Sequence, residues 1–289
     1  MFGNRKITCT NEDRVEISFT ETEFTPFLLA KAAGIYDTNN TVTTTTYNVM
    51  DGAAYQGSVT KPRNIVLTLI DKEPFDANRD LIDVVFERGK LGHLVVEDDS
   101  HTRGIIYYTE SVTSTATPGK RFTTISLLCP DPFFHDEHDT HVYIANLVPV
   151  FEFIHEFYES EELGYFNDER IGTIVNETAE TAIGLTMKMK AWGTVVNPVI
   201  TKIETQEHIA LGTQADPFTM HFGDYVIIQT TTGSKNIFDE HGNSVNQYLT
   251  EGSTFFQLNR GVNSIGYSAD SGEDYISVDV AYNYRYMRA

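Results

Sequence analysis

Residues 51–70 read DGAAYQGSVTKPRNIVLTLI, in which a loop spaced by glycines runs into an almost wholly apolar segment. The segment 64–70 has the length and the β-branched content of a buried strand. Pro62 fixes its own φ angle and lacks a backbone donor, which marks the beginning of that strand. The guanidinium of Arg63 offers a planar fork of donors to a carboxylate or to backbone carbonyls. We therefore predict a strand start at Pro62, Arg63 and Asn64.

Alternating apolar and polar residues continue on both sides of this stretch. The longest run lies near the C-terminus, where 276–287 alternates strictly over twelve residues. Such alternation indicates a strand with one buried face. Further strands are predicted at 15–19, 93–97, 104–110, 121–129, 183–190, 199–205, 225–231, 254–258 and 263–268. One helix is predicted near 78–89, with Asp76 as its N-cap and Gly89 at its end.

A proline-rich segment divides the chain. Pro130 and Pro132 stand two positions apart, and proline resists both a helix and a central strand. A boundary after them gives domains 1–135 and 136–289, each of an ordinary size. Turn residues at short spacing predict sandwiches or barrels in this mainly β chain.

Three runs are less regular. The threonine- and serine-rich runs 43–46 and 111–117 are predicted to be exposed loops. The acidic and aromatic run 150–163 fits either a helix or a strand.

Composition and charge exclude several classes of function. The chain has 289 residues, with 40% hydrophobic and 12% aromatic side chains, which is typical of a globular protein. It carries 41 acidic and 21 basic side chains, a formal net charge of −20. Nucleic-acid binding needs clustered cations, and membrane surfaces are anionic, so neither partner is expected. No apolar segment has the length of a signal peptide core or a membrane span, so we expect synthesis in the cytoplasm.

The strongest candidate for chemistry is HDEHDTH at 135–141. His135, His138 and His141 are of a type that binds zinc or manganese. A solvated acidic linker explains the same run without a metal, and this is the interpretation that we adopt. Motifs for nucleophilic catalysis and for nucleotide binding are absent. Cys9 and Cys129 lie far apart and are expected to be ordinary thiols. We predict no catalytic residue, no cofactor and no metal.

Three aromatic residues of the second half are candidates for stacking on a saccharide. Trp192 is the single tryptophan, and Tyr225 and Tyr248 lie in the same half of the chain. Aromatic side chains combine a flat apolar body with a polar group, which suits a sugar-binding face of a sandwich. Burial in the core is the alternative for Trp192.

The order of short motifs resembles the distal tail proteins of bacteriophages with long, non-contractile tails and of prophages of Gram-positive bacteria. The motifs are YQG at 55–57, PRNI at 62–65, the helix near 78–89, CPDPFF at 129–134, IVN at 174–176, GTVVNPVI at 193–200, GDYVI at 223–227, FFQLNRGVN at 255–263 and the tyrosine-rich last strand. The chain departs from the family at Glu177, where a Gly-Asp pair is common, and at Arg260, where a proline is common.

The resemblance implies a mainly β protein that is not an enzyme. Its N-terminal domain would be a split barrel or β-sandwich with one helix, completed by the last strand at 276–289, that closes into a ring of six subunits. Its C-terminal domain would be a galectin-like or carbohydrate-module-like β-sandwich.

The implied function is the structural hub of a tail tip or baseplate in the virion, assembled in the host cytoplasm. The ring would let DNA pass and would join the major tail tube protein to the tape measure, the tail-tip or tail-associated protein and the receptor-binding protein. Pro62, Arg63 and Asn64 are then candidates for the contact between subunits, with an Arg63 bonded inside its own subunit as the alternative. A carbohydrate-binding module for host-surface saccharide, acting through the C-terminal sandwich, is the alternative function.

Overall fold

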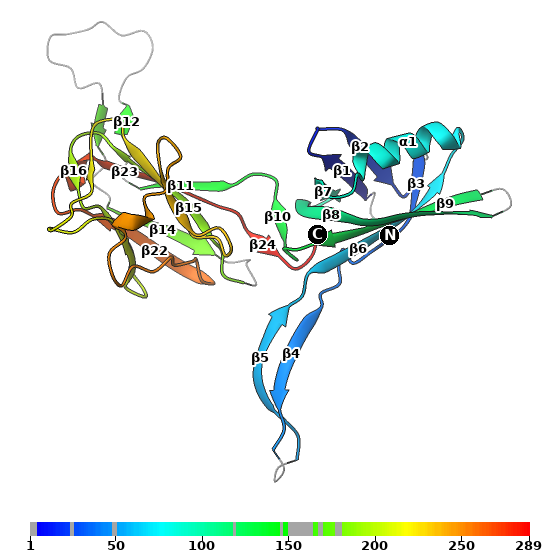
Figure 1. The fold of residues 1–289 in the computed structure, drawn as a ribbon, viewed down its shortest axis with the longest axis horizontal. Helices are drawn as coiled ribbons and strands as arrows, with labels where there is room; N and C mark the ends of the chain where they lie inside the picture. Colours follow the sequence, from blue (N-terminus) through cyan, green and yellow to red (C-terminus); the bar gives the residue numbers. More distant parts are fainter. Residues whose placement is uncertain are drawn as a thin grey trace, which may run out of the picture. The chain divides into compact units, whose positions relative to one another are not determined.

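The computed structural model describes residues 5–23, 26–47, 51–117, 120–144, 147–149, 164–166, 170–176 and 181–289. The chain divides into two compact units, one of 1–137 with 285–289 and one of 138–284. Both units are built mainly from strands, and the described residues contain one α-helix (Figure 1). The predicted mainly β fold with one helix is therefore confirmed. The ambiguous run 150–163 lies outside the described residues.

The first unit is a closed barrel of seven strands. In spatial order they are β8 (Thr102–Thr117), β7 (Leu91–Glu97), β1 (Lys6–Asn11), β2 (Glu16–Thr20), β3 (Phe27–Ala33), β6 (Arg63–Asp71) and β9 (Lys120–Cys129), and β9 pairs again with β8. Inward residues alternate with outward ones, so that Ile65, Leu67 and Leu69 of β6 are wholly buried. Cys9 and Cys129 are buried in the barrel as free thiols. Two short strands, β10 (Phe134–Asp136) and β24 (Arg285–Tyr286), continue the sheet beside β8.

Helix α1 (Phe75–Val85) covers part of the barrel with its buried residues Ile82 and Val85. The predicted cap and end of this helix are wrong. Pro74 is the N-cap, and Asp76 lies inside the first turn, where a carboxylate favours the positive end of the helix dipole. Phe86 is the C-cap, and Gly89, at φ +80°, belongs to the following turn.

Two runs predicted as loops are strands. Residues 43–45 belong to β4 (Asn40–Thr45), which pairs with β5 (Ala54–Thr60), and 111–117 belong to β8. Threonine suits the pleated backbone, but these segments reach beyond the barrel and have no buried face along most of their length. Without a buried face the sequence shows no apolar alternation from which a strand could be recognised.

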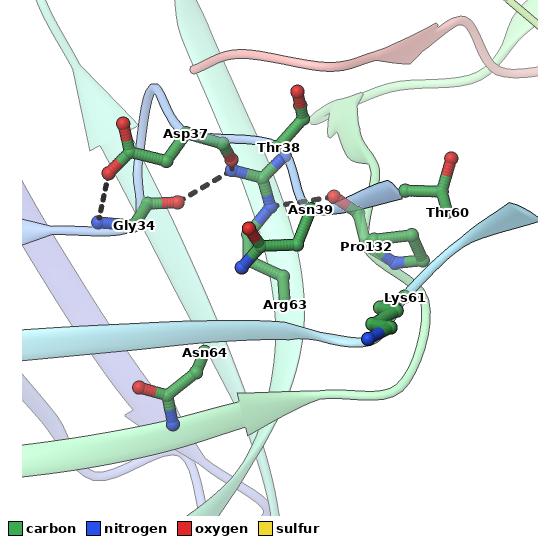
Figure 2. A pocket seen from close by; sticks show the side chains of 9 residues that line it. All are labelled: Gly34, Asp37, Thr38, Asn39, Thr60, Lys61, Arg63, Asn64 and Pro132. Atoms are coloured by element: carbon green, nitrogen blue, oxygen red, sulfur yellow. Dashed lines mark hydrogen bonds between the residues drawn. The ribbon is translucent and has the colours of Figure 1, made fainter. Parts of the chain in front are cut away.

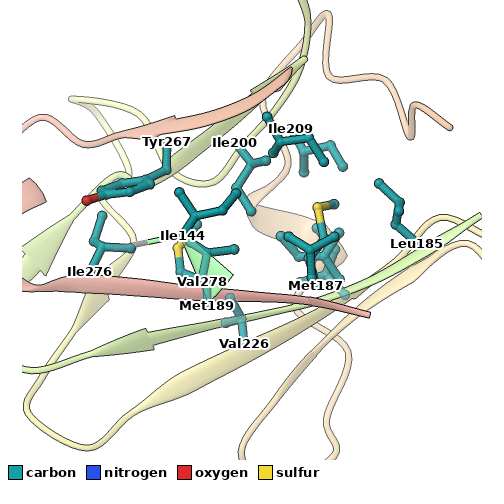
Figure 3. Packing of buried hydrophobic residues seen from close by; sticks show 14 of the residues in the cluster. Ile144, Leu185, Met187, Met189, Ile200, Ile209, Val226, Tyr267, Ile276 and Val278 are labelled. Carbon is teal, nitrogen blue, oxygen red and sulfur yellow. The ribbon is translucent and has the colours of Figure 1, made fainter. Parts of the chain in front are cut away.

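The second unit is a sandwich of two antiparallel sheets. The five-stranded sheet runs β11 (Thr140–Ile144), β23 (Ile276–Tyr282), β15 (Leu185–Ala191), β20 (Tyr225–Gln229) and β21 (Asn236–Asp239). The four-stranded sheet runs β14 (Ile171–Asn176), β22 (Gly261–Ser268), β17 (Val199–Lys202) and β18 (Glu207–Ala210). Figure 3 shows Met187 and Met189 of one sheet packed toward Ile200 and Ile209 of the other.

The remaining elements of this unit are small. They are the pair β12 (Leu147–Pro149) with β13 (Gly164–Phe166), the pair β16 (Val195–Val196) with β19 (Thr219–Met220), and the 3₁₀ turns η1 (Asn246–Tyr248) and η2 (Glu273–Tyr275). The predicted strand at 254–258 is absent, because the segment makes only one isolated bridge, between Leu258 and Ile183. Its side chain Phe256 is nevertheless buried in the core.

The predicted long strand at 276–287 is two strands. Residues 276–282 form β23 inside the second unit, and only 285–289 belong to the first unit. The alternation of the sequence continues through Asn283 and Tyr284, where the chain passes from one unit to the other. In the part of the chain that the structure describes, no helix has the length and hydropathy required to cross a membrane.

Candidate assembly and binding surfaces

Arg63 stands at the first position of β6 and is 5% exposed. Its Nε donates to Pro132 O at 2.7 Å, and its Nη1 donates to Gly34 O at 2.6 Å and Asp37 O at 2.7 Å (Figure 2). Its Nη2 donates to Met287 O at 2.6 Å. Burial lowers the pKa of this guanidinium, and a buried charge is tolerated where its donors are paired. The space around the group holds about 20 Å³, about one water-sized sphere, so this is a packed structural site.

These bonds connect parts of the first unit that are distant in sequence. Gly34 and Asp37 lie on the chain that leads into β4, and Arg63 follows the return from β5. Pro132 and Met287 lie beside the two places where the chain passes between the units. Arg63 therefore fixes the base of the β4–β5 hairpin, and all of these bonds lie within one chain.

Pro62 and Asn64, by contrast, are exposed. Asn64 Nδ2 donates to Glu110 Oε2 and to Ser126 Oγ, at 2.9 Å each, on the outer surface of the barrel. Of the three residues proposed for a subunit contact, these two lie on the surface, whereas the Arg63 side chain is enclosed.

The β4–β5 hairpin, which we call the arm, extends away from the barrel (Figure 1). Its apolar side chains are open to solvent: Val42 is 57% exposed, Tyr55 67% and Val59 71%. A two-stranded hairpin is at best marginally stable in water by itself. Sequence reasoning missed the arm as a surface. The available signal was the threonine-rich run 41–46, which stands before the glycine-containing stretch that leads into Pro62.

Trp192 and Tyr225 lie on the outer side of the five-stranded sheet. The Lys190 Nζ lies 3.9 Å from the centre of the Trp192 ring, and the Lys188 Nζ lies 4.0 Å from the centre of the Tyr225 ring. Trp192 Nε1 donates to Ser277 Oγ at 2.9 Å. The indole is therefore partly exposed rather than part of the buried core.

Tyr248, the third saccharide candidate, packs its ring against Phe218 with the ring centres 5.1 Å apart. Tyr225 and Tyr248 line the same surface groove of about 310 Å³, and Trp192 is not part of its lining. The structure thus places Tyr225 and Tyr248 along one groove and does not bring all three residues into one site.

The histidines of the 135–141 run are directed to different partners. His135 belongs to β10, and its Nε2 lies 3.5 Å from Asp131 Oδ2. His141 belongs to β11, and its Nδ1 lies 2.9 Å from Asp279 Oδ1. Within the described ranges, no three side chains of the metal-binding types gather at one point. The run predicted as a linker contains a passage between the two units, at 137–138, and its ends belong to β10 and β11.

Asp131 also holds the C-terminal segment, because Arg285 Nη2 donates to both of its carboxylate oxygens at 2.7 and 2.8 Å. Partial desolvation alone would raise the pKa of Asp131, but the bonds from His135 and Arg285 lower it below its ordinary value of 3.8. The two sequence-distant strands β10 and β24 are thereby held together.

Comparison with known proteins identifies solved structures that share this fold. No protein-family model and no curated protein sequence matches the chain. The solved structure of the Dit protein of SPP1 matches at a TM-score of 0.69, with 11% identity, over 97% of this chain and 99% of that one. A chain of the phage P2 baseplate in its activated conformation with calcium matches at 0.54, with 10% identity, over the whole of both chains. The SPP1 protein is described as a paradigm of the hub adsorption apparatus in phages that infect Gram-positive bacteria. Over nearly its whole length, this chain has the fold of the SPP1 Dit protein.

Proposed function

We propose that this protein is the structural hub of a phage tail tip, in which six copies close into a ring that joins the tail tube to the proteins of the tip. The observation that carries the proposal is the fold match to the SPP1 Dit protein over 97% of the chain. Both units take part in that match, so the likeness is to a whole protein rather than to a common module.

The arm supports the ring assembly. A ring is built from a head-to-tail contact in which one surface of a subunit meets a different surface of its neighbour. The exposed Val42, Tyr55 and Val59 supply apolar area that a subunit cannot bury alone. In the proposed ring the arm lies against the neighbouring barrel, and Arg63 acts indirectly, by fixing the direction in which the arm leaves its own barrel.

The charge of the chain fits a channel for DNA. A net charge of −20 repels the phosphate backbone and keeps a passing duplex from adhering. The proposed partners are the major tail tube protein, the tape measure, the tail-tip or tail-associated protein and the receptor-binding protein. The proposed role is structural and requires no catalytic residue.

A comparison of arm variants tests the assembly. The triple variant Val42→Ser, Tyr55→Ser and Val59→Ser removes apolar area from the arm, and Val262→Ser, 61% exposed in the second unit, is the matched control. Sedimentation should show a hexamer for the wild type and for the control, and a monomer of 32.5 kDa for the triple variant. A triple variant that assembles like the wild type would contradict the role of the arm.

A further inference from the structure

Cations are rare in the second unit. Residues 138–284 contain 21 acidic and six basic side chains. Arg170 is paired with Glu273 and Asp274, and Lys202 is buried. Two of the remaining four basic residues, Lys188 and Lys190, stand two positions apart on β15, near the middle of the five-stranded sheet. They project to the same outer side, with their Cα atoms about 7 Å apart.

Within the described residues, the two lysines have aromatic rings as partners. Lys188 stands directly opposite Asp279 in the register of β15 and β23, but the carboxylate of Asp279 is bound by His141. The ammonium groups lie instead over the rings of Tyr225 and Trp192. Neither lysine forms an ion pair in the ranges that the structure describes. Ring faces attract a cation without using up its charge, so both ammonium groups keep donors for an external anion.

Apolar and hydroxyl groups surround this pair. Phe222 is 73% exposed, and its ring lies edge-on to Trp192 with the ring centres 6.1 Å apart. Ser277 stands opposite Lys190 in the register. The surface therefore combines two cations, flat aromatic surface and a hydroxyl group. A sugar chain that carries anionic groups presents the complementary set: negative charges, the apolar faces of its rings, and hydroxyls.

We propose that the outer face formed by Lys188, Lys190, Trp192, Tyr225 and Phe222 binds an anionic saccharide. The lysines would bind the phosphate, sulfate or carboxylate groups, and the exposed ring of Phe222 would pack against a sugar ring. A neutral sugar is a poorer fit, because the ammonium groups occupy the ring faces on which it would stack. This binding function goes beyond the proposed hub role and does not depend on ring assembly.

The single tryptophan makes the site its own reporter, because all indole fluorescence comes from Trp192. The full chain is titrated with dextran sulfate, with uncharged dextran and with polyglutamate. We expect a saturable change with dextran sulfate, none with dextran, and binding of polyglutamate weaker by about tenfold. Equal binding of polyglutamate would contradict the preference for a saccharide. The absence of a saturable change with dextran sulfate would contradict the existence of the binding site.

Substitutions on the proposed face test whether dextran sulfate binds there. Lys188→Gln with Lys190→Gln should weaken binding of dextran sulfate about tenfold or more, since each substitution removes a charged hydrogen bond. Phe222→Ala should weaken dextran sulfate but leave polyglutamate unchanged. The matched control is Lys235→Gln, an exposed lysine beyond the opposite end of β20 from Tyr225. A lysine pair whose removal has the same effect as the control would overturn the proposal, and unchanged thermal unfolding excludes misfolding.

Discussion

Arg63 in the first unit and the pair Lys188 and Lys190 in the second are cations of the same acidic chain in different surroundings. The Arg63 guanidinium is enclosed and donates to backbone carbonyls of distant segments. The two lysines lie at the surface over aromatic rings. The number and kind of partners, rather than the charge itself, separates a cation that holds a fold together from one that is available to a ligand.

The largest effect is expected for Arg63→Ala. The substitution leaves the carbonyls of Gly34, Asp37, Pro132 and Met287 without their donor. The free energy of unfolding of the barrel should fall by about 3–5 kcal/mol, because several carbonyls lose a hydrogen bond from a charged donor at once. Denaturant titration measures this loss.

Arg63→Lys is the informative second variant. A single ammonium cannot reproduce the fork that reaches acceptors on separate segments, so most of the loss should remain. Wild-type stability in Arg63→Ala would show that the buried network does not hold the base of the arm.

Lys202 combines the residue type of the surface lysines with the burial of Arg63. Its side chain is 1% exposed, and its Nζ donates to Gln257 O at 2.7 Å. Burial lowers the pKa of Lys202, so its charge is costly in the sandwich. Lys202→Met keeps the packing but leaves the Gln257 carbonyl unpaired, and should cost about 1–3 kcal/mol in the free energy of unfolding. A gain in stability would show that desolvation of the charge outweighs its bond.

The Asp131–Arg285 pair predicts that the stability of the first unit falls in acid. The pKa of Asp131 is lower in the folded state than its ordinary value of 3.8. Its contribution to stability is therefore fully present above that value and is lost as the pH falls through the folded value. The exposed position of the carboxylate, 44% accessible, keeps the effect smaller than that of Lys202. Thermal unfolding of Asp131→Asn between neutral and acidic pH should show a flatter profile than the wild type, whereas exposed Asp99→Asn should not.

The smallest effect on stability is expected at the surface pair. Lys188→Gln and Lys190→Gln remove no buried contact, so each should change the free energy of unfolding by no more than about 0.5 kcal/mol. The same substitutions are predicted to reduce binding of dextran sulfate. A marked loss of stability, measured by denaturant titration, would show that these lysines stabilise the fold as Arg63 does. It would contradict the distinction between enclosed cations and cations available to a ligand.

The sequence predicted the strands that have one buried face. In β6, for example, Ile65, Leu67 and Leu69 point into the barrel and alternate with outward residues. The sequence therefore shows the alternation of a strand with one buried face. The arm was missed because nearly all of its side chains are exposed, and a strand without a buried face carries no alternation. The passage between units at Asn283 and Tyr284 was missed for the opposite reason, since the alternation continues across it.

The surroundings of the candidate residues could not be predicted. The partners of Arg63 are backbone carbonyls, which every residue carries, so no side chain marks them in the sequence. The position of Lys188 over Tyr225 depends on the pairing of β15 with β20, which is a matter of register between distant segments. The types of residue at 62–64 and 192 marked these positions as candidates for a contact or a binding site. Only the fold shows which of the side chains are enclosed.

The proposed hub function depends on the closure of several copies of this chain into a ring. Light scattering of the purified wild type, followed by negative-stain microscopy of the same fraction, tests it most directly. We expect a mass of about six times 32.5 kDa and ring-shaped particles. A protein that keeps the mass of one chain at every concentration, or that forms open filaments instead of rings, would contradict it.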